Sequence, residues 1–243
     1  MTHPMEVALR KGVGDLALRL DDTQIDQLLA YQDLIQKWTR VYNLTAVRDP
    51  AEMLTHHLLD SLAIISSLQV KLARKNSPVG QGGEDLSDLA AIAGVTASAP
   101  APARLLDVGS GAGLPGIVIA VCCPHITVHC VDTVAKKAAF IQQVAASLRL
   151  SNLRGIHARV ESLTEQYEVV TSRAFASLAD FVTWSHAALA PQGIWMGMKG
   201  KHPADEMAAL PSSVKVFHVE QLAVPGLDAE RCIVWMRKAQ LLL

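Results

Sequence analysis

Cysteines are scarce in this chain, and their arrangement favours neither a disulfide framework nor a metal site. Four occur in 243 residues, and none belongs to a C-x-x-C pair. Cys122 and Cys123 are adjacent and cannot form an ordinary structural bridge with each other. We therefore expect reduced cysteines, as in cytosolic proteins, and no bound metal.

Long apolar runs and excess charge are also missing. No stretch of about 18 consecutive apolar residues occurs, which excludes a membrane-spanning helix. The N-terminus lacks the basic and apolar segments of a signal peptide. The 22 basic and 23 acidic side chains nearly cancel, whereas a free-standing nucleic-acid binder is usually basic. The sequence therefore predicts a cytoplasmic protein in which any contact with RNA depends on a local basic patch.

Helical periodicity dominates the N-terminal region, residues 1–73. Apolar side chains recur every three or four positions over 22–42, where Thr23 and Asp26 resemble a capping box. A second helix is predicted to begin at Asp49-Pro50, because Asp caps helices and Pro suits the first helical position. Residues 74–103 are instead rich in Gly, Ala, Ser and Pro, so we expect an insertion or linker with only a weak helix at 86–92.

From residue 104 to 243 the pattern alternates between short apolar strands and helices, which predicts βαβ units. Strands are expected at 105–108, 126–131, 153–158, 169–172, 194–198, 214–221 and 232–237, and helices at 114–122, 134–149, 177–189 and 203–209. The last two strands have no helix between them and should pair antiparallel. The predicted fold is α/β, with a doubly wound, mostly parallel, seven-stranded sheet and an α-helical N-terminal appendage.

A glycine-rich turn between the first strand and the next helix is the sharpest motif. It runs Asp107-Val108-Gly109-Ser110-Gly111-Ala112-Gly113-Leu114-Pro115-Gly116. Its glycines let a ligand approach the main chain, and the start of the following helix attracts an anionic group. The loop satisfies both the G-x-G-x-G of methyltransferases and the G-x-G-x-x-G of dinucleotide-binding proteins. A turn without any ligand is the third possibility.

Two carboxylates help to choose between these ligands. Asp107 would repel a pyrophosphate, but it can orient the loop or accept a hydrogen bond from the ammonium group of S-adenosylmethionine. Asp132 ends the next predicted strand and can accept from both ribose hydroxyls, which fits either ligand. We therefore predict an S-adenosylmethionine site.

With these motifs in view, the chain resembles the ribosomal RNA small subunit methyltransferase G family. The resemblance spans nearly all of the chain beyond the first 20 residues and outside the insertion. Its blocks lie at residues 42–46, 57–61, 107–117, 136–140, 159–161, 172–175, 199–200 and 225–231. Two features depart from the family pattern: the 74–103 insertion is long, and Cys232 stands where a histidine is common. Neither touches the cofactor motifs.

The resemblance implies a Rossmann-like class I methyltransferase that transfers a methyl group from S-adenosylmethionine to N7 of one guanosine, at position 527 of bacterial 16S rRNA. We expect a monomer that acts on 16S rRNA, on the small ribosomal subunit or on an assembly intermediate, and neither on DNA nor at a membrane. The expected cofactor-binding residues are Asp107, Gly109, Gly111, Gly113, Leu114, Asp132, Val160, Glu161 and Arg173. Two hypotheses from other functional classes stay open. The chain could be a non-catalytic RNA- or ribosome-binding module, or an NAD-dependent oxidoreductase.

No residue stands out as a general base, and guanine N7 needs none because it carries a free lone pair. Candidates for positioning the substrate are Arg159, Arg173, Lys199 and Asn43. With Lys201 and His202, the three basic candidates could form a rim for RNA phosphates, although a solvated surface explains them almost as well. His56 and His57 are expected to be structural, and all four tryptophans are expected to lie in the core.

Overall fold

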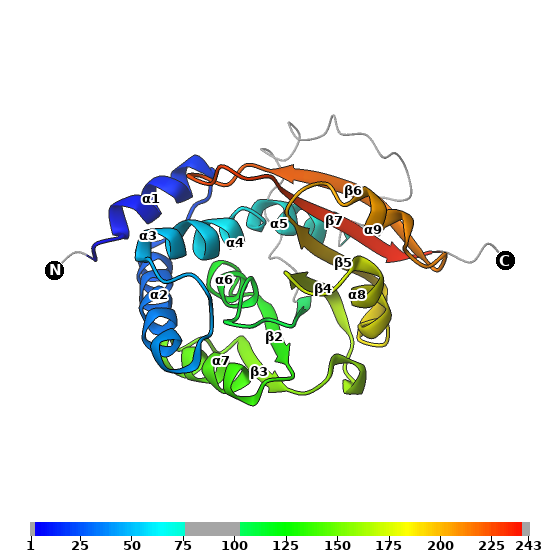
Figure 1. The fold of residues 1–243 in the computed structure, drawn as a ribbon, viewed down its shortest axis with the longest axis horizontal. Coiled ribbons are helices and arrows are strands. Elements are labelled where there is room, and N and C mark those ends of the chain that lie inside the picture. The colour runs from blue at the N-terminus through cyan, green and yellow to red at the C-terminus, as the bar shows by residue number, and fades with distance from the viewer. Residues whose placement is uncertain (1–2, 76–102, 240–243) are drawn as a thin grey trace.

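The computed structural model describes residues 3–75 and 103–239 (Figure 1). Nearly all of the predicted insertion, including its helix at 86–92, lies outside these residues. The N-terminal region is helical, as expected, and also contains a first helix that the sequence analysis missed. Its elements are α1 (Glu6–Asp15), α2 (Asp22–Tyr42), α3 (Pro50–Met53), a π-helical segment (Leu54–Leu59), α4 (Asp60–Leu62) and α5 (Ile65–Lys75).

The starts of two of these helices follow from local capping. Helix α2 has a capping box, but it is formed by Asp21 and Gln24, so the expected pair of Thr23 and Asp26 was wrong. Helix α3 begins as predicted, because the side chain of Asp49 accepts from the N–H groups of Ala51 and Glu52. The rare π-helical turn that follows widens the helix just before Asp60, and such turns often mark functional sites.

The remainder of the chain forms one seven-stranded sheet with strand order β3-β2-β1-β4-β5-β7-β6. The strands are β1 (Ala103–Val108), β2 (Ile126–Asp132), β3 (Leu153–His157), β4 (Tyr167–Arg173), β5 (Leu189–Lys199), β6 (Val214–Leu222) and β7 (Arg231–Lys238). Five strands are parallel, and β7 runs antiparallel to both β5 and β6. The predicted mostly parallel sheet with an antiparallel last pair is confirmed.

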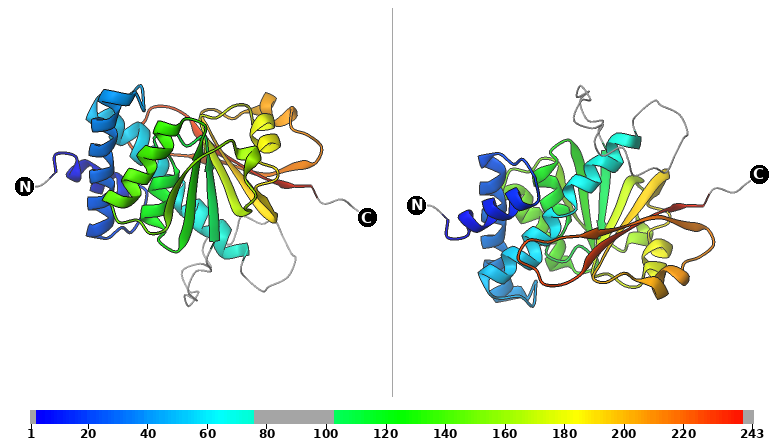
Figure 2. Two further views of the ribbon diagram at one scale, coloured as in Figure 1. Left: turned by 90° about the horizontal axis from the view of Figure 1, so that it is seen from below. Right: turned by 90° about the horizontal axis from the view of Figure 1, so that it is seen from above.

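Helices cover both faces of the sheet (Figure 2). The connecting helices are α6 (Gly116–Cys122), α7 (Ala135–Ser147), α8 (Leu178–Trp184) and α9 (Ala204–Ala208). One apolar cluster joins α6 and α7 to the N-terminal helices and to one face, and a second joins α8 to the other face. This is the doubly wound arrangement that was expected, although α8 ends at Trp184 rather than at residue 189, where β5 has already begun.

The N-terminal helices share a core with the sheet. Leu28 of α2 and Leu68 of α5 are fully buried in the same cluster as Ile117 and Val128. The N-terminal helices are therefore packed against the sheet. The division of the chain into segments 1–73, 74–103 and 104–243 stays a prediction. Within the described part of the chain, no helix is long and apolar enough to cross a membrane, and no group of side chains could hold a metal ion.

Candidate active site at the carboxyl edge of the sheet

The glycine loop lies over the ends of β1 and β2. The N–H groups of Gly109 and Ser110 both donate to the carbonyl oxygen of Val131, at 2.9 and 3.3 Å. Gly111 has a φ of 58°, which favours glycine, and a Cβ there would meet nothing nearer than the carbonyl oxygen of Gly109 at 4.0 Å. The loop therefore presents open backbone to a ligand at Gly111.

Two side chains hold this loop from the sheet and from the N-terminal region. The Oδ2 atom of Asp132 accepts from the N–H of Gly111 at 3.0 Å, and its Oδ1 accepts from the N–H of Val134 at 2.9 Å. The buried hydroxyl of Tyr31 in α2 donates to the carbonyl oxygen of Ala112 at 2.7 Å. Each oxygen of Asp132 keeps a further lone pair, so the carboxylate can still accept from ribose hydroxyls.

Asp107 is fully buried beneath the loop. Its Oδ2 accepts from the N–H of Gly116 at 2.9 Å, while its Oδ1 and the hydroxyl of Ser110 have no hydrogen-bond partner. Burial raises the pKa of Asp107 to about 7, against the opposing effects of the Gly116 N–H and of Arg173. Buried polar atoms without partners are costly, and a donor that reached Oδ1 of Asp107 would offset this cost, but Asp107 does not line the pocket beside the loop. The open backbone of the loop and the carboxylate of Asp132 fit S-adenosylmethionine.

A pocket of about 470 Å³, here called the cofactor pocket, opens beside the loop. Four of the predicted cofactor-binding residues line it: Gly109, Asp132, Val160 and Glu161. Its other lining residues are Val108, Val131, Thr133, Val134, Lys137, Ala158, Arg159, Ala174, Phe175 and Trp184. Asp107, Gly111, Gly113 and Leu114 are not part of this lining, and the side chains of Asp107 and Leu114 are buried.

Two ion pairs border the cofactor pocket. Lys137 approaches Asp132, with 3.6 Å between its Nζ and Oδ2 of the carboxylate. Arg159 is largely exposed and lies 2.8 Å from Glu161, and this hydrogen bond lowers the pKa of the glutamate. Glu161 therefore stays ionised at neutral pH and can accept a hydrogen bond from a ligand.

Two aromatic side chains of the cofactor pocket were not predicted as site residues. Phe175 packs so closely on the loop that a Cβ at Gly109 would overlap its ring. Trp184 was expected in the core, which was wrong: 39% of it is exposed, and it faces the pocket. The apolar pattern of the sequence could not reveal the exposure of Trp184. Helix α8 ends at this residue, and the indole lies outside the buried face of the helix.

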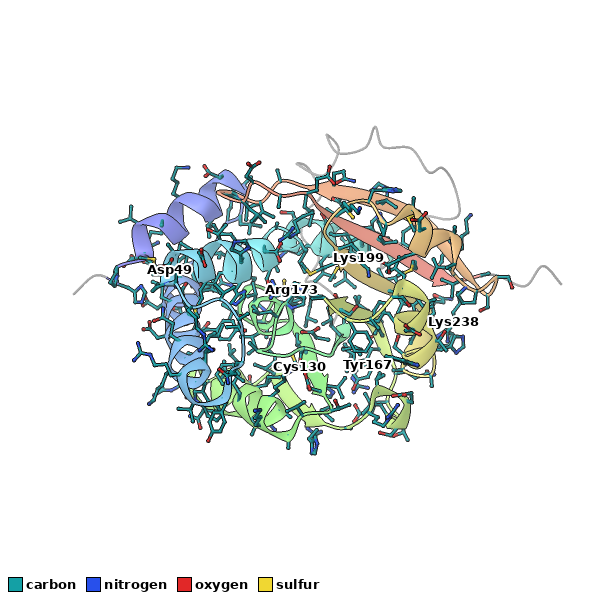
Figure 3. All side chains as sticks on the ribbon, in the orientation of Figure 1. Asp49, Cys130, Tyr167, Arg173, Lys199 and Lys238 are labelled. Atoms are coloured by element: carbon teal, nitrogen blue, oxygen red, sulfur yellow. The ribbon has the colours of Figure 1, made fainter. Side chains whose placement is uncertain are left out.

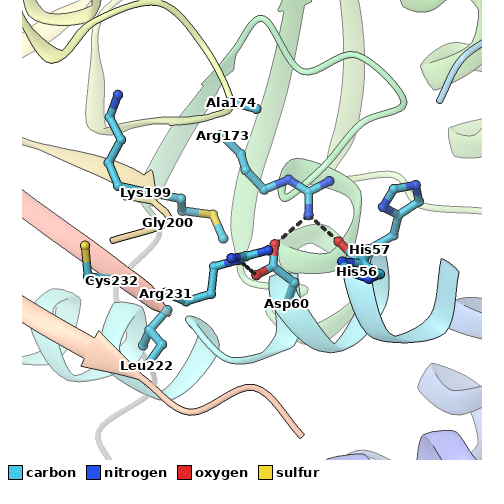
Figure 4. A pocket seen from close by; sticks show the side chains of 11 residues that line it. His56, His57, Asp60, Arg173, Ala174, Lys199, Gly200, Leu222, Arg231 and Cys232 are labelled. Atoms are coloured by element: carbon cyan, nitrogen blue, oxygen red, sulfur yellow. Dashed lines mark hydrogen bonds and ion pairs between the residues drawn. The ribbon is translucent and has the colours of Figure 1, made fainter. Parts of the chain in front are cut away.

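Figure 4 shows a second pocket of about 370 Å³, here called the basic pocket. Ala174 lines both pockets. Arg173 lines the basic pocket and not the cofactor pocket, although it was expected to contact the cofactor. The other lining residues are His56, His57, Asp60, Met198, Lys199, Gly200, Leu222, Arg231 and Cys232.

A buried carboxylate holds two arginines at the basic pocket. The Oδ2 atom of Asp60 lies 2.8 Å from Nη1 of Arg173, and its Oδ1 lies 2.8 Å from Nε of Arg231. Nη1 of Arg173 also donates to the carbonyl oxygen of His56. Lys199 pairs with Glu206 at 2.7 Å and lies far from Lys238 at the other end of the sheet (Figure 3). The cationic side chains of Arg173, Arg231 and Lys199 are thus paired with two carboxylates, those of Asp60 and Glu206.

Asp60 and Arg231 were missed as site residues although the sequence contained a signal for each. Asp60 follows His56 by four positions, which places both on one face of a helix. Arg231 begins β7, and because β7 runs antiparallel to its neighbour β5, the start of β7 lies at the edge where β5 ends, with Cys232 opposite Lys199. Both residues belong to blocks of the family resemblance.

Other predicted residues lie away from the two pockets or have local roles. Asn43 ends α2 in a left-handed conformation, and its Oδ1 accepts from Arg48 at 2.6 Å. His57 is buried, as expected, with its Nε2 2.8 Å from the hydroxyl of Thr45. His202 lines a separate groove beside α9. The substrate-positioning role of Asn43 stays a prediction.

Comparison of the sequence with a family model and with individual proteins identifies the same family. A family model described as rRNA small subunit methyltransferase G matches residues 24–83 and 85–234. The protein named ribosomal RNA small subunit methyltransferase G from Albidiferax ferrireducens is 65% identical over 237 residues, covering 97% of this chain and 98% of that protein. Its namesake from Polaromonas naphthalenivorans is 63% identical and covers 94% of each chain. Among solved structures, TrmN from Thermus thermophilus matches 57% of this chain and 45% of its own, with a TM-score of 0.47 and 19% identity.

Proposed function

This chain belongs to the rRNA small subunit methyltransferase G family, and we propose that it transfers the methyl group of S-adenosylmethionine to N7 of guanosine 527 in bacterial 16S rRNA. The observation that carries this proposal is the contact between the two pockets. The cofactor pocket contains the glycine loop and Asp132, the basic pocket contains Arg173 and Lys199, and Ala174 lines both. A methyl donor in the first would adjoin a nucleotide in the second.

The basic pocket suits the sugar–phosphate backbone of RNA. Arg173 and Arg231 share one carboxylate and keep further N–H donors for an anion. These arginines cannot read guanine at O6 and N7, as arginine often does, because N7 must stay free to accept the methyl group. We therefore assign them, with Lys199, to phosphates.

The proposed reaction requires little acid–base catalysis by the chain. When bound, S-adenosylmethionine supplies an electrophilic methyl group on a sulfonium centre. Guanine N7 carries a lone pair and no proton, so no residue has to remove one. His57 lines the basic pocket, but burial lowers its pKa to about 4 and leaves it neutral. The chain contributes mainly proximity and alignment, which can supply several kcal/mol.

Arg159, Arg173, Lys199 and Asn43 are proposed to position the substrate. The residues proposed to hold the cofactor are Asp107, Gly109, Gly111, Gly113, Leu114, Asp132, Val160, Glu161 and Arg173. The support is strongest for Gly109, Asp132, Val160 and Glu161, which line the cofactor pocket. We further propose that residues 104–243 bind the cofactor and that residues 1–73 brace the loop, which the hydrogen bond from Tyr31 to Ala112 supports.

Mass mapping of 16S rRNA tests the proposal most directly. Small subunits and naked 16S rRNA from cells without the gene would each be incubated with the purified chain and S-adenosylmethionine. We expect a new methyl group on N7 of guanosine 527. A methyl group on an exocyclic amine or on another nucleotide would contradict the assignment.

Titration with S-adenosylhomocysteine and NAD separates the remaining functional classes. We expect binding of S-adenosylhomocysteine and none of NAD. Binding of NAD alone would favour an oxidoreductase, and RNA binding without either cofactor would favour a non-catalytic module. We propose a monomer that acts in the cytoplasm and binds neither DNA nor membranes, and sedimentation of the purified chain with and without 16S rRNA checks the oligomeric state.

A further inference from the structure

Trp184 occupies a position unlike that of the other three tryptophans. Trp195 and Trp235 are fully buried, and their indole N–H groups donate to Ser185 and Glu220. Trp38 packs between Tyr42 and Phe140. Trp184, by contrast, is 39% exposed at the end of α8. A large aromatic surface is therefore left uncovered by the described residues.

Neighbouring rings fix the orientation of this indole. The ring of Phe175 meets Trp184 edge to face, with 5.6 Å between centroids and an interplanar angle of 87°. Phe175 in turn meets the buried Phe181 at 6.4 Å and 73°. Because Phe175 also packs on Gly109, this row of rings leads from the core to the glycine loop. Trp184 is thus held at the pocket by packing.

The exposed face belongs to the cofactor pocket. Trp184 lines this pocket together with Asp132, Val160 and Glu161, and it takes no part in the basic pocket. The largest flat group of S-adenosylmethionine is its adenine ring. Aromatic side chains bind nucleobases by stacking or by edge-to-face packing, and alanine substitution at such contacts is costly.

We propose that Trp184 forms one wall of the adenine subsite and packs against the base of the cofactor. This inference rests on the proposed function, since it assumes that S-adenosylmethionine occupies the cofactor pocket. Asp132 then meets the ribose, while Trp184 and Val160 contribute apolar surface to the base. Trp184 is a cofactor-binding residue and has no direct contact with the target guanosine.

Tryptophan fluorescence tests the inference on the full chain. We expect S-adenosylhomocysteine and adenosine, but not methionine, to change the emission of the wild-type chain and of the control variant Trp38→Phe. The change should be lost in Trp184→Phe. By calorimetry, Trp184→Ala should weaken S-adenosylhomocysteine binding roughly 5- to 150-fold, and Trp184→Phe should recover part of this loss. Thermal melting of each variant checks that it is folded.

Several outcomes would overturn the inference. One is equal affinity of Trp184→Ala and wild type for S-adenosylhomocysteine. Another is an emission change that appears only with a guanosine-containing RNA, which would assign Trp184 to the substrate. If the wild-type chain does not bind S-adenosylhomocysteine at all, the proposed function fails first. The two failures are therefore distinguishable.

Discussion

The Nη1 atom of Arg173 lies 2.8 Å from Oδ2 of Asp60, and this pair joins the end of strand β4 to the helical N-terminal region. The same carboxylate binds Arg231 at the start of β7. Three elements that are far apart in the sequence thus meet at one buried side chain. The basic pocket depends on this connection.

Replacing Asp60 by alanine should destabilise the chain. The carboxylate is buried, and its removal would leave two largely buried guanidinium groups without their shared partner. Breaking such a pair costs about 3 kcal/mol or more, as measured by urea unfolding. Asp15→Asn is the matched control, because its ion pair with Lys11 is exposed and should contribute little. An equal effect of both substitutions would show that Asp60 adds nothing beyond a surface pair.

Gly111→Val should abolish binding of S-adenosylhomocysteine. The added side chain would enter the open space above the loop, and the left-handed backbone would add roughly 1–2 kcal/mol of strain. Gly226→Val is the control, since Gly226 has a similarly positive φ but lies outside the glycine loop. Calorimetry should therefore show binding lost in the first variant and kept in the second. Binding retained in Gly111→Val would place the cofactor elsewhere.

Affinity for RNA should depend on salt through the basic side chains at the carboxyl edge. Lys199→Ala is expected to reduce the slope of log K against log salt concentration by about 1, because one phosphate contact is lost. Lys238→Ala is the control, since Lys238 donates to the carbonyl oxygen of Leu189 at the other end of β5. Filter binding over a salt series measures both slopes. Identical slopes for Lys199→Ala and wild type would show that Lys199 makes no contact with an RNA phosphate.

The single-turnover methylation rate should change little with pH around neutrality. No proton leaves guanine N7, and His57 stays neutral because its pKa is lowered to about 4. The rate would be measured at saturating cofactor and RNA, where the structure of the RNA is constant.

A steep ionisation near pH 7 that disappears in His56→Gln or His202→Gln would reveal a catalytic proton transfer. N7 would then be a poor target, and an exocyclic amine or a ribose hydroxyl a better one. An ionisation step in the rate that disappears only in Asp107→Asn would instead be assigned to Asp107 beneath the glycine loop. Guanine N7 would then remain the expected methylation target.

Asp107 should make the stability of the unliganded chain depend on pH. Burial raises its pKa from the usual 3.8 to about 7, so the folded state binds the proton more tightly than the unfolded state. Its contribution is fully present below pH 3.8 and is lost as the pH rises towards 7. Relative to wild type, Asp107→Asn should therefore gain stability between these values, by up to about 4 kcal/mol. Urea unfolding at several pH values measures this difference, and a constant difference would contradict the raised pKa.

Local sequence determined most of the secondary structure and the position of the glycine loop. The periodicity of residues 22–42 and the cap at Asp49 predicted α2 and α3 because these signals act between near neighbours. The seven strands were recognised from short apolar runs. Gly109 and Asp132, which line the cofactor pocket, were selected from their places at strand ends. The loop motif alone left three possibilities open: S-adenosylmethionine, a dinucleotide, or a turn without a ligand. Asp107 favoured the first, and the blocks of family resemblance supported that choice.

Tertiary structure alone decided which distant side chains meet. Asp60, Arg173 and Arg231 come from three elements, and only the insertion of β7 between β5 and β6 brings Arg231 to the carboxyl edge. The exposure of Trp184 depends on where α8 ends against the sheet, which periodicity does not encode. Long-range packing and burial set these positions, as well as the raised pKa of Asp107. A sequence pattern records which residues are apolar, but not which surface the fold leaves uncovered.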